Sequence, residues 1–140
     1  MRLGIMAVLL FSLACGNSDS SSEPTNASIA GTWTLTTING SSLPYLVSQT
    51  SEGKAEITAA VVTISSNGTW SSSNTTRTTP TAASPVTTTQ SYGGTYTLAG
   101  NVAALKSSDG SINAATFSGN SFTIPVELND AITTWRYTKQ

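Results

Sequence analysis

Apolar and polar residues alternate over short segments along most of the chain. The clearest segment is 121–128, where apolar side chains occupy every second position from Phe122 to Leu128. In 30–38, Trp33 and Leu35 share one face, and threonines occupy the other. Alternation with a period of two predicts β-strands with one buried face. Pro125 cannot donate a ladder hydrogen bond, so we expect a bulge or an unpaired position there.

Turn residues separate these segments at fairly regular intervals. Asn39-Gly40, Asn67-Gly68, Asp109-Gly110 and Asn129-Asp130 are typical of tight turns, because these residues accept positive φ. Between the turns we expect eight strands: Ala30–Ile38, Ala55–Ser65, Thr69–Thr78, Val86–Leu98, Val102–Lys106, Ile112–Ser118, Ser121–Leu128 and Ala131–Thr138. Consecutive antiparallel strands can close on themselves. The predicted fold is therefore all-β, an eight-stranded antiparallel up-and-down barrel.

Three segments fit this scheme less simply. A short helical turn near Tyr45–Gln49 is the only helix that the pattern allows. Residues 55–64 are apolar on both faces in their later half, which indicates a central strand or one bent by a bulge. Ser71–Gln90 contains Pro80 and Pro85 among Thr, Ser and Ala, and it predicts a long mobile excursion between two strands.

The first residues have the layout of an export signal. Arg2 precedes about eleven mostly apolar residues, and Ala14 precedes Cys15, the single cysteine. The apolar run is shorter than the roughly 20 residues of a membrane span. The segment resembles a bacterial lipoprotein signal, although Ser12 stands where Leu is commoner. The alternative is an ordinary signal peptide on a soluble secreted protein.

This resemblance implies three regions. Residues 1–14 would be the signal peptide, and Cys15 would carry acyl chains such as palmitate. Residues 15–28 contain no large apolar side chain, so we expect a disordered, Ser-rich tether ahead of a domain at 29–140. The protein would be lipid-anchored in the bacterial cell envelope, in the outer rather than the inner membrane, because Gly16 and not Asp follows the cysteine.

Composition narrows the possible chemistry. Charged residues make up 9% of the chain, the net charge is −1, and His is absent. Nucleic-acid binding needs a basic face, so we expect none. We also expect no metal and no cofactor. Glu52, Lys54 and Glu56 could form a site, but an exposed charged rim is the simpler interpretation. We therefore expect that the protein is not an enzyme.

Several short motifs resemble the lipocalins and related calycin barrels. Gly31-Thr32-Trp33 matches the Gly-x-Trp that opens their first strand. Asn39-Gly40 followed by Leu43-Pro44, then Ser66–Trp70 and Gly94–Leu98, look like the lipocalin-like domains of small bacterial lipoproteins. The resemblance implies a calycin-type barrel in which Arg136, on the last strand, packs over Trp33. It also implies ligand carriage.

Aromatic residues are the candidates for ligand contact. Trp33, Phe117 and Phe122 are expected in the core. Tyr45 and Trp70 are expected near loop–strand junctions at one barrel mouth, and Tyr45, Trp70, Tyr96 and Trp135 are the predicted ligand-binding residues.

Two functions remain open. The first is a monomeric barrel that binds a small hydrophobic or amphipathic molecule. The alternative is an interaction or structural lipoprotein with a filled barrel, which contacts a protein or cell-wall partner through its loops. An internal cavity of about 300 Å³ or more would favour the first function, and a packed interior would favour the second.

Overall fold

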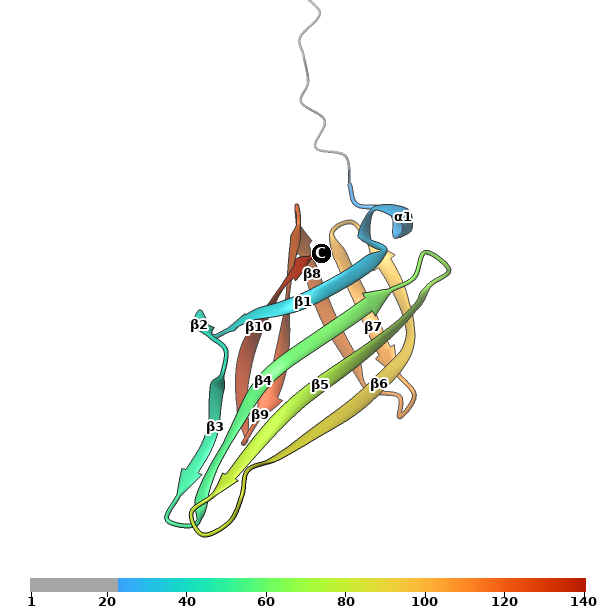
Figure 1. The fold of residues 1–140 in the computed structure, drawn as a ribbon. Helices are drawn as coiled ribbons and strands as arrows, with labels where there is room; N and C mark the ends of the chain where they lie inside the picture. The colour runs from blue at the N-terminus through green and yellow to red at the C-terminus, as the bar shows by residue number, and fades with distance from the viewer. Residues whose placement is uncertain (1–22) are drawn as a thin grey trace, which may run out of the picture.

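Ten strands follow a single helical turn in residues 23–140, the part of the chain that the computed structural model describes (Figure 1). The elements are α1 (Asn26–Ile29), β1 (Gly31–Ile38), β2 (Ser41–Ser42), β3 (Tyr45–Thr50), β4 (Gly53–Ile64), β5 (Thr69–Pro80), β6 (Val86–Ala99), β7 (Val102–Ser107), β8 (Ile112–Ser118), β9 (Ser121–Leu128) and β10 (Ala131–Lys139).

Eight of these strands close into an antiparallel barrel, as the sequence predicts. Each strand from β4 to β10 pairs with the next, and β1 pairs with both β10 and β4 to complete the ring. The turns follow the expected chemistry, since Asn39, Gly40, Asn129 and Asp130 all have positive φ. The two short strands lie outside the ring, β2 against β1 and β3 against β4.

The predicted helical turn at Tyr45–Gln49 is wrong, because this segment is strand β3. Tyr45 pairs with Ile57 and Thr50 with Gly53. The first half of β4 extends past β1, so its free edge offers backbone partners that a lone helical turn would lack. The predicted bulge in β4 is confirmed by a register shift between Ile57 and Ala59.

The predicted mobile excursion at Ser71–Gln90 is also wrong. This segment belongs to a long hairpin of β5 and β6, paired continuously from Thr69 with Thr95 to Thr78 with Val86. Pro80 ends β5, and Pro85 immediately precedes β6, so both prolines flank the turn and neither interrupts the ladder.

Pro125 causes no bulge and lies where one edge of β9 has no partner strand. It pairs in regular register with Thr134 of β10. On its other side the ladder with β8 ends at Thr123, so the missing N–H of Pro125 interrupts no pairing there.

The core is concentrated at the end of the barrel that carries α1. Trp33 is 1% exposed and meets Phe117 and Phe122 edge-to-face, with centroid separations of 5.4 and 5.2 Å. Phe122 stacks on Tyr137 at 4.7 Å. These contacts confirm the predicted core positions of Trp33, Phe117 and Phe122, and they fill this half of the barrel with aromatic rings.

The turn α1 fixes the start of the domain against this core. Thr25 and Ser28 form a capping box. Buried Ile29 accepts a 3.0 Å hydrogen bond through its carbonyl oxygen from the indole Nε1 of Trp33. Part of the predicted flexible tether, residues 26–28, is therefore helical. The predictions for residues 1–14, Cys15 and the start of the tether lie outside the described residues. No helix in 23–140 has the length and apolar character needed to cross a membrane.

Lys139, and not Arg136, packs over the signature tryptophan. The Nζ atom of Lys139 lies 5.3 Å from the Trp33 ring centroid and donates to the carbonyl of Ser28 at 2.7 Å. Arg136 is exposed and donates to the hydroxyl of Ser121. The expectation fails because side chains alternate along β10, which turns Arg136 outward.

Candidate binding cavity

Two ladders stop short in the half of the barrel away from α1. Pairing of β8 with β9 covers only residues 116–118 and 121–123, and pairing of β6 with β7 begins at Gly94. Residues 86–92 of β6 and 124–128 of β9 therefore each have one unpaired edge, and the β5–β6 hairpin continues beyond β7 (Figure 1). A cavity of about 370 Å³ lies between these elements.

Gly93 and Gly94 mark the point where β6 leaves β7. A Cβ atom on Gly94 would overlap the carbonyl oxygen of Lys106, so only glycine allows this close approach. The indole Nε1 of Trp70, which pairs with Gly94 across the hairpin, donates to the carbonyls of Thr95 and Lys106 at 3.1 and 3.3 Å. Trp70 thus joins β5 to β7 at the inner end of the cavity.

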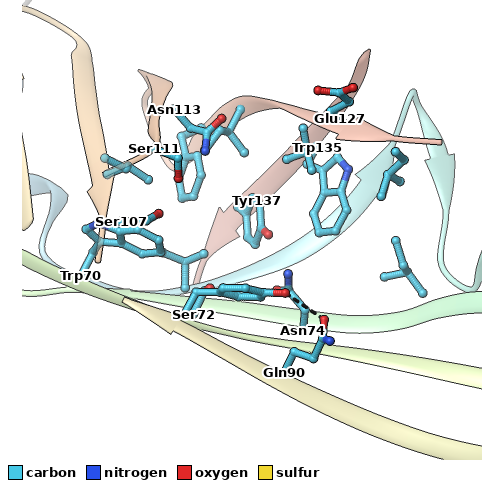
Figure 2. A pocket seen from close by; sticks show the side chains of 18 of the residues that line it. Trp70, Ser72, Asn74, Gln90, Ser107, Ser111, Asn113, Glu127, Trp135 and Tyr137 are labelled. Carbon is cyan, nitrogen blue, oxygen red and sulfur yellow. Dashed lines mark hydrogen bonds between the residues drawn. The ribbon is translucent and has the colours of Figure 1, made fainter. Parts of the chain in front are cut away.

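One wall of the cavity is apolar and comes mainly from β9 and β10 (Figure 2). Trp135 is 3% exposed, and its indole donates to the Thr133 hydroxyl at 2.9 Å, which satisfies its polar atom away from the cavity. Burial raises the pKa of the neighbouring Tyr137 hydroxyl, so it stays neutral. The other apolar lining residues are Ile57, Val62, Leu105, Phe122, Ile124, Val126 and Leu128.

The opposite wall is polar and comes from the β5–β6 hairpin. Ser72, Asn74 and Thr76 occupy alternate positions on β5, and Gln90 pairs with Asn74 from β6. The hydroxyl of Tyr92 donates to Gln90 Oε1 at 2.8 Å (Figure 2), which leaves the Gln90 amide nitrogen able to donate.

Asn74 is the unusual member of this wall. Its Oδ1 atom is buried and accepts no hydrogen bond from any described residue. A buried carbonyl without a donor costs about 1–3 kcal/mol, so such groups normally have a partner. Asn74 lines the cavity and therefore brings an acceptor without a partner in residues 23–140 to its polar wall.

The ionisable groups among the lining residues are carboxylates and tyrosines. Asp109 and Glu127 are both exposed, and no Lys or Arg is among the lining residues. The Asp109 carboxylate accepts hydrogen bonds from the backbone N–H and the hydroxyl of Ser111 at 2.9 and 2.7 Å. These bonds lower the pKa of Asp109 and keep it ionised near neutral pH.

The cavity brings together two of the four predicted ligand-binding residues, Trp70 and Trp135. Tyr96 is buried elsewhere, with its hydroxyl bonded to the Ser65 carbonyl at 2.8 Å and its pKa raised by burial. Tyr45 lies on β3 and does not line the cavity.

Tyr45 and Trp70 were expected at one mouth, and this expectation is wrong. Tyr45 pairs with Ile57, in the first half of β4, whereas Trp70 pairs with Ile64, where β4 ends. At about 3.3 Å per residue, these positions are separated by most of the strand's length.

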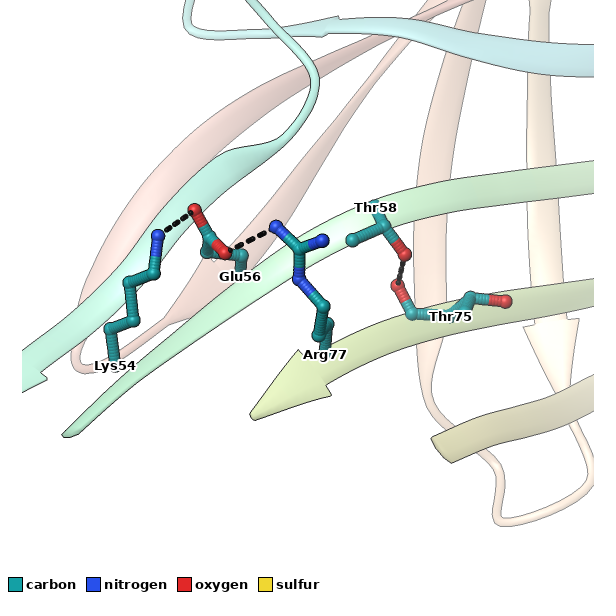
Figure 3. Close-up of polar contacts among 5 residues, drawn as sticks. All are labelled: Lys54, Glu56, Thr58, Thr75 and Arg77. Atoms are coloured by element: carbon teal, nitrogen blue, oxygen red, sulfur yellow. Dashed lines mark hydrogen bonds and ion pairs between the residues drawn. The ribbon is translucent and has the colours of Figure 1, made fainter. Parts of the chain in front are cut away.

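A cluster of charges lies on the other face of the β4–β5 ladder. Glu56, only 8% exposed, contacts Lys54 Nζ and Arg77 Nη2 at 2.9 Å each (Figure 3). The hydrogen bonds from Arg77 and then Lys54 lower the pKa of Glu56 against the opposing effect of desolvation. The expected exposed rim is thus an ion-paired cluster without Glu52, in which Glu56 is covered and the side chains of Lys54 and Arg77 stay partly exposed. The sequence interpretation missed Arg77. The ion pair between Glu56 and Arg77 links β4 to β5 beside the bulge in β4.

Comparison with known proteins adds little to this geometry. No family model matches the chain, and no curated protein matches its sequence. Among solved structures, it is similar to that of Echinococcus granulosus fatty-acid-binding protein 1, with 13% identity over 79% of this chain and 96% of that chain, and a TM-score of 0.35. At this TM-score the similarity carries no argument about family or ligand, so the barrel assignment rests on the strand pairings described above.

Proposed function

We propose that the chain is a lipid-anchored bacterial envelope protein whose lipocalin-like barrel binds a small hydrophobic or amphipathic molecule without transforming it. The observation that carries the proposal is the cavity of about 370 Å³ between the β5–β6 hairpin and the β9–β10 wall. Its volume is in the range of small-molecule sites, which begins at about 300 Å³. Apart from the exposed carboxylates of Asp109 and Glu127, apolar and uncharged polar groups line it on opposite sides, which suits binding more than chemistry.

The proposed anchor is Cys15, with the membrane as partner through the attached lipid. Its support is the signal-like pattern of residues 1–15 and the place of α1, which lies at the packed end of the barrel (Figure 1). An anchor ahead of residue 23 would leave the unpaired edges beside the cavity facing away from the attachment point. Cys15→Ser should move the protein from the membrane fraction to the soluble fraction, and a variant that still sediments with membranes would contradict the anchor.

Binding can be tested with N-phenyl-1-naphthylamine, a neutral dye that fluoresces in apolar surroundings. Ser72→Trp places a bulky side chain in the cavity and should abolish the fluorescence increase. Ser71→Trp is the matched control, because Ser71 is exposed on the outer face of the same strand. If both variants and the wild type bind the dye equally, the cavity is not the site.

The alternative function, a structural or interaction lipoprotein that uses its loops, has one observation in its favour. All residues from 81 to 92, at the tip and free edge of the β5–β6 hairpin, are exposed. A folded wild-type protein that binds no neutral dye at tens of micromolar would make this alternative the better proposal.

A further inference from the structure

The polar wall of the cavity has the chemistry of a site for hydroxyl groups. Inward positions at the α1 end of the barrel are filled by aromatic rings, yet those of β5 beyond Trp70 are Ser72, Asn74 and Thr76. Polar side chains turned into a barrel need partners, and the buried Oδ1 of Asn74 has none among the described residues. Rotation of the Asn74 side-chain amide would turn this acceptor toward the cavity, where a ligand donor would satisfy it.

Gln90 adds the complementary half of the site. It pairs with Asn74 across the hairpin, and its carbonyl is already occupied by the Tyr92 hydroxyl. Its amide nitrogen can therefore donate to a ligand beside the Asn74 acceptor. A hydroxyl group both donates and accepts, so neighbouring hydroxyls on one ligand could meet both amides (Figure 2).

Charge argues against an anionic head group. The cavity lining contains no Lys or Arg, and its two exposed carboxylates belong to Asp109 and Glu127. The nearby guanidinium of Arg77 is on the other face of β5, hydrogen-bonded to Glu56. A carboxylate ligand would be desolvated in the cavity without a counter-charge, which is strongly unfavourable.

We infer that the cavity binds an uncharged amphiphile with a hydroxyl-bearing head, such as a monoacylglycerol or an alkyl glycoside. The head contacts Asn74 and Gln90, and the alkyl chain lies along Trp135 and the apolar residues of β9. The inference rests on the proposed function, because it names the ligand class of the same cavity.

The test compares three probes with twelve-carbon chains, each kept below its micelle concentration: monolauroylglycerol, laurate and dodecyltrimethylammonium. Calorimetric titration of the full chain at neutral pH should show monolauroylglycerol binding at least about tenfold more tightly than either ion. Laurate binding equally or more tightly would overturn the inference and leave the proposed function standing. Dodecyltrimethylammonium binding equally or more tightly than monolauroylglycerol would also overturn the inference and leave the proposed function standing. It would indicate that the carboxylates of Asp109 and Glu127 recognise the ligand. No binding of any probe to the folded protein would overturn both.

Variants of the polar wall provide the second part of the test. Asn74→Leu should weaken monolauroylglycerol binding about tenfold without lowering the thermal midpoint, because it also removes an unpaired buried carbonyl. Ser73→Leu, on the outer face of the same strand, is the control and should leave binding unchanged. Gln90→Leu serves as a second variant if Asn74→Leu does not fold, since Gln90 is exposed. Unchanged affinity in the folded wall variants would overturn the inference.

Discussion

Replacement of Trp33 tests how the packed end of the barrel is stabilised. A buried aromatic side chain removes about 150–250 Å² from water, worth roughly 4–6 kcal/mol at about 25 cal/mol per Å². In the alanine variant the surrounding side chains relax into the space, which offsets part of this loss of burial free energy. Trp33→Ala should therefore lower the free energy of unfolding by about 3–5 kcal/mol. Its exposure of 1% and its edge-to-face contacts with Phe117 and Phe122 place it at the upper part of that range.

Trp33→Phe separates packing from hydrogen bonding at the same position. Phenylalanine keeps an aromatic ring beside Phe117 and Phe122 but cannot donate to the Ile29 carbonyl. A loss of about 1–3 kcal/mol is expected, because that buried carbonyl would lose its donor. Amide hydrogen exchange should also become faster in residues 26–29, since this hydrogen bond holds α1 to the core.

The measurement is urea unfolding followed by far-ultraviolet circular dichroism, which does not depend on the tryptophan being removed. Thr32→Ala is the control, because Thr32 is an exposed neighbour on β1. It should change the free energy of unfolding by less than about 1 kcal/mol. If Trp33→Ala behaved like this control, the aromatic cluster would not be the main source of stability and the reasoning would be refuted.

Three further predictions concern other parts of the barrel. Gly94→Ala should sharply lower the thermal midpoint of unfolding, because the added Cβ would overlap the backbone carbonyl of Lys106. Gly93→Ala should lower it less, because a Cβ there would lie 3.1 Å from its nearest atom, the carbonyl oxygen of Trp70. Equal effects of the two variants would contradict the close approach at Gly94. The lowered pKa of Glu56 means that its contribution to stability is full above the ordinary pKa of 4.5 and is lost as the pH falls through the lower folded-state value, so Glu56→Gln should flatten the acid side of a stability–pH curve. Lys139→Met should remove a cation–π contact worth about 0.5–2 kcal/mol and increase proteolysis near α1, and unchanged cleavage would count against its role.

The barrel could be predicted because its signals are local. In 121–128 each inward position is apolar, and Asn39-Gly40 and Asn129-Asp130 form turns through their own φ preferences. The alternation on β10 also indicates that Lys139 points inward, because it lies an even number of residues from Trp135 and Tyr137. The resemblance to the family motif favoured Arg136 instead.

The strands of the β5–β6 hairpin were expected at Thr69–Thr78 and Val86–Leu98, but the face of the hairpin that lies inward could not be predicted in the same way. Ser, Thr and Asn occupy both faces of residues 71–78, so there is no contrast between an inner and an outer face to detect. Asn74 points inward because it shares alternate positions with Trp70 and Ser72 along β5, and the polar side chains on both faces give no sign of which face is the inner one. For the same reason Asn74 and Gln90 were missed as cavity residues, while the aromatic Trp70 and Trp135 were found.

Closure of the barrel through β1 and β10 has a consequence for how the chain folds. Gln140 donates a hydrogen bond to Thr34 across a separation of 106 residues, and Lys139 reaches Ser28 across 111. Contacts of such long range raise the contact order, which slows folding, because the entropy of closing a large loop is lost before the contacts form. The ring also cannot close until β10 is available, because β10 pairs with β1. A chain that is still emerging from a ribosome therefore lacks the seam between β1 and β10, and its barrel stays open until β10 has been made.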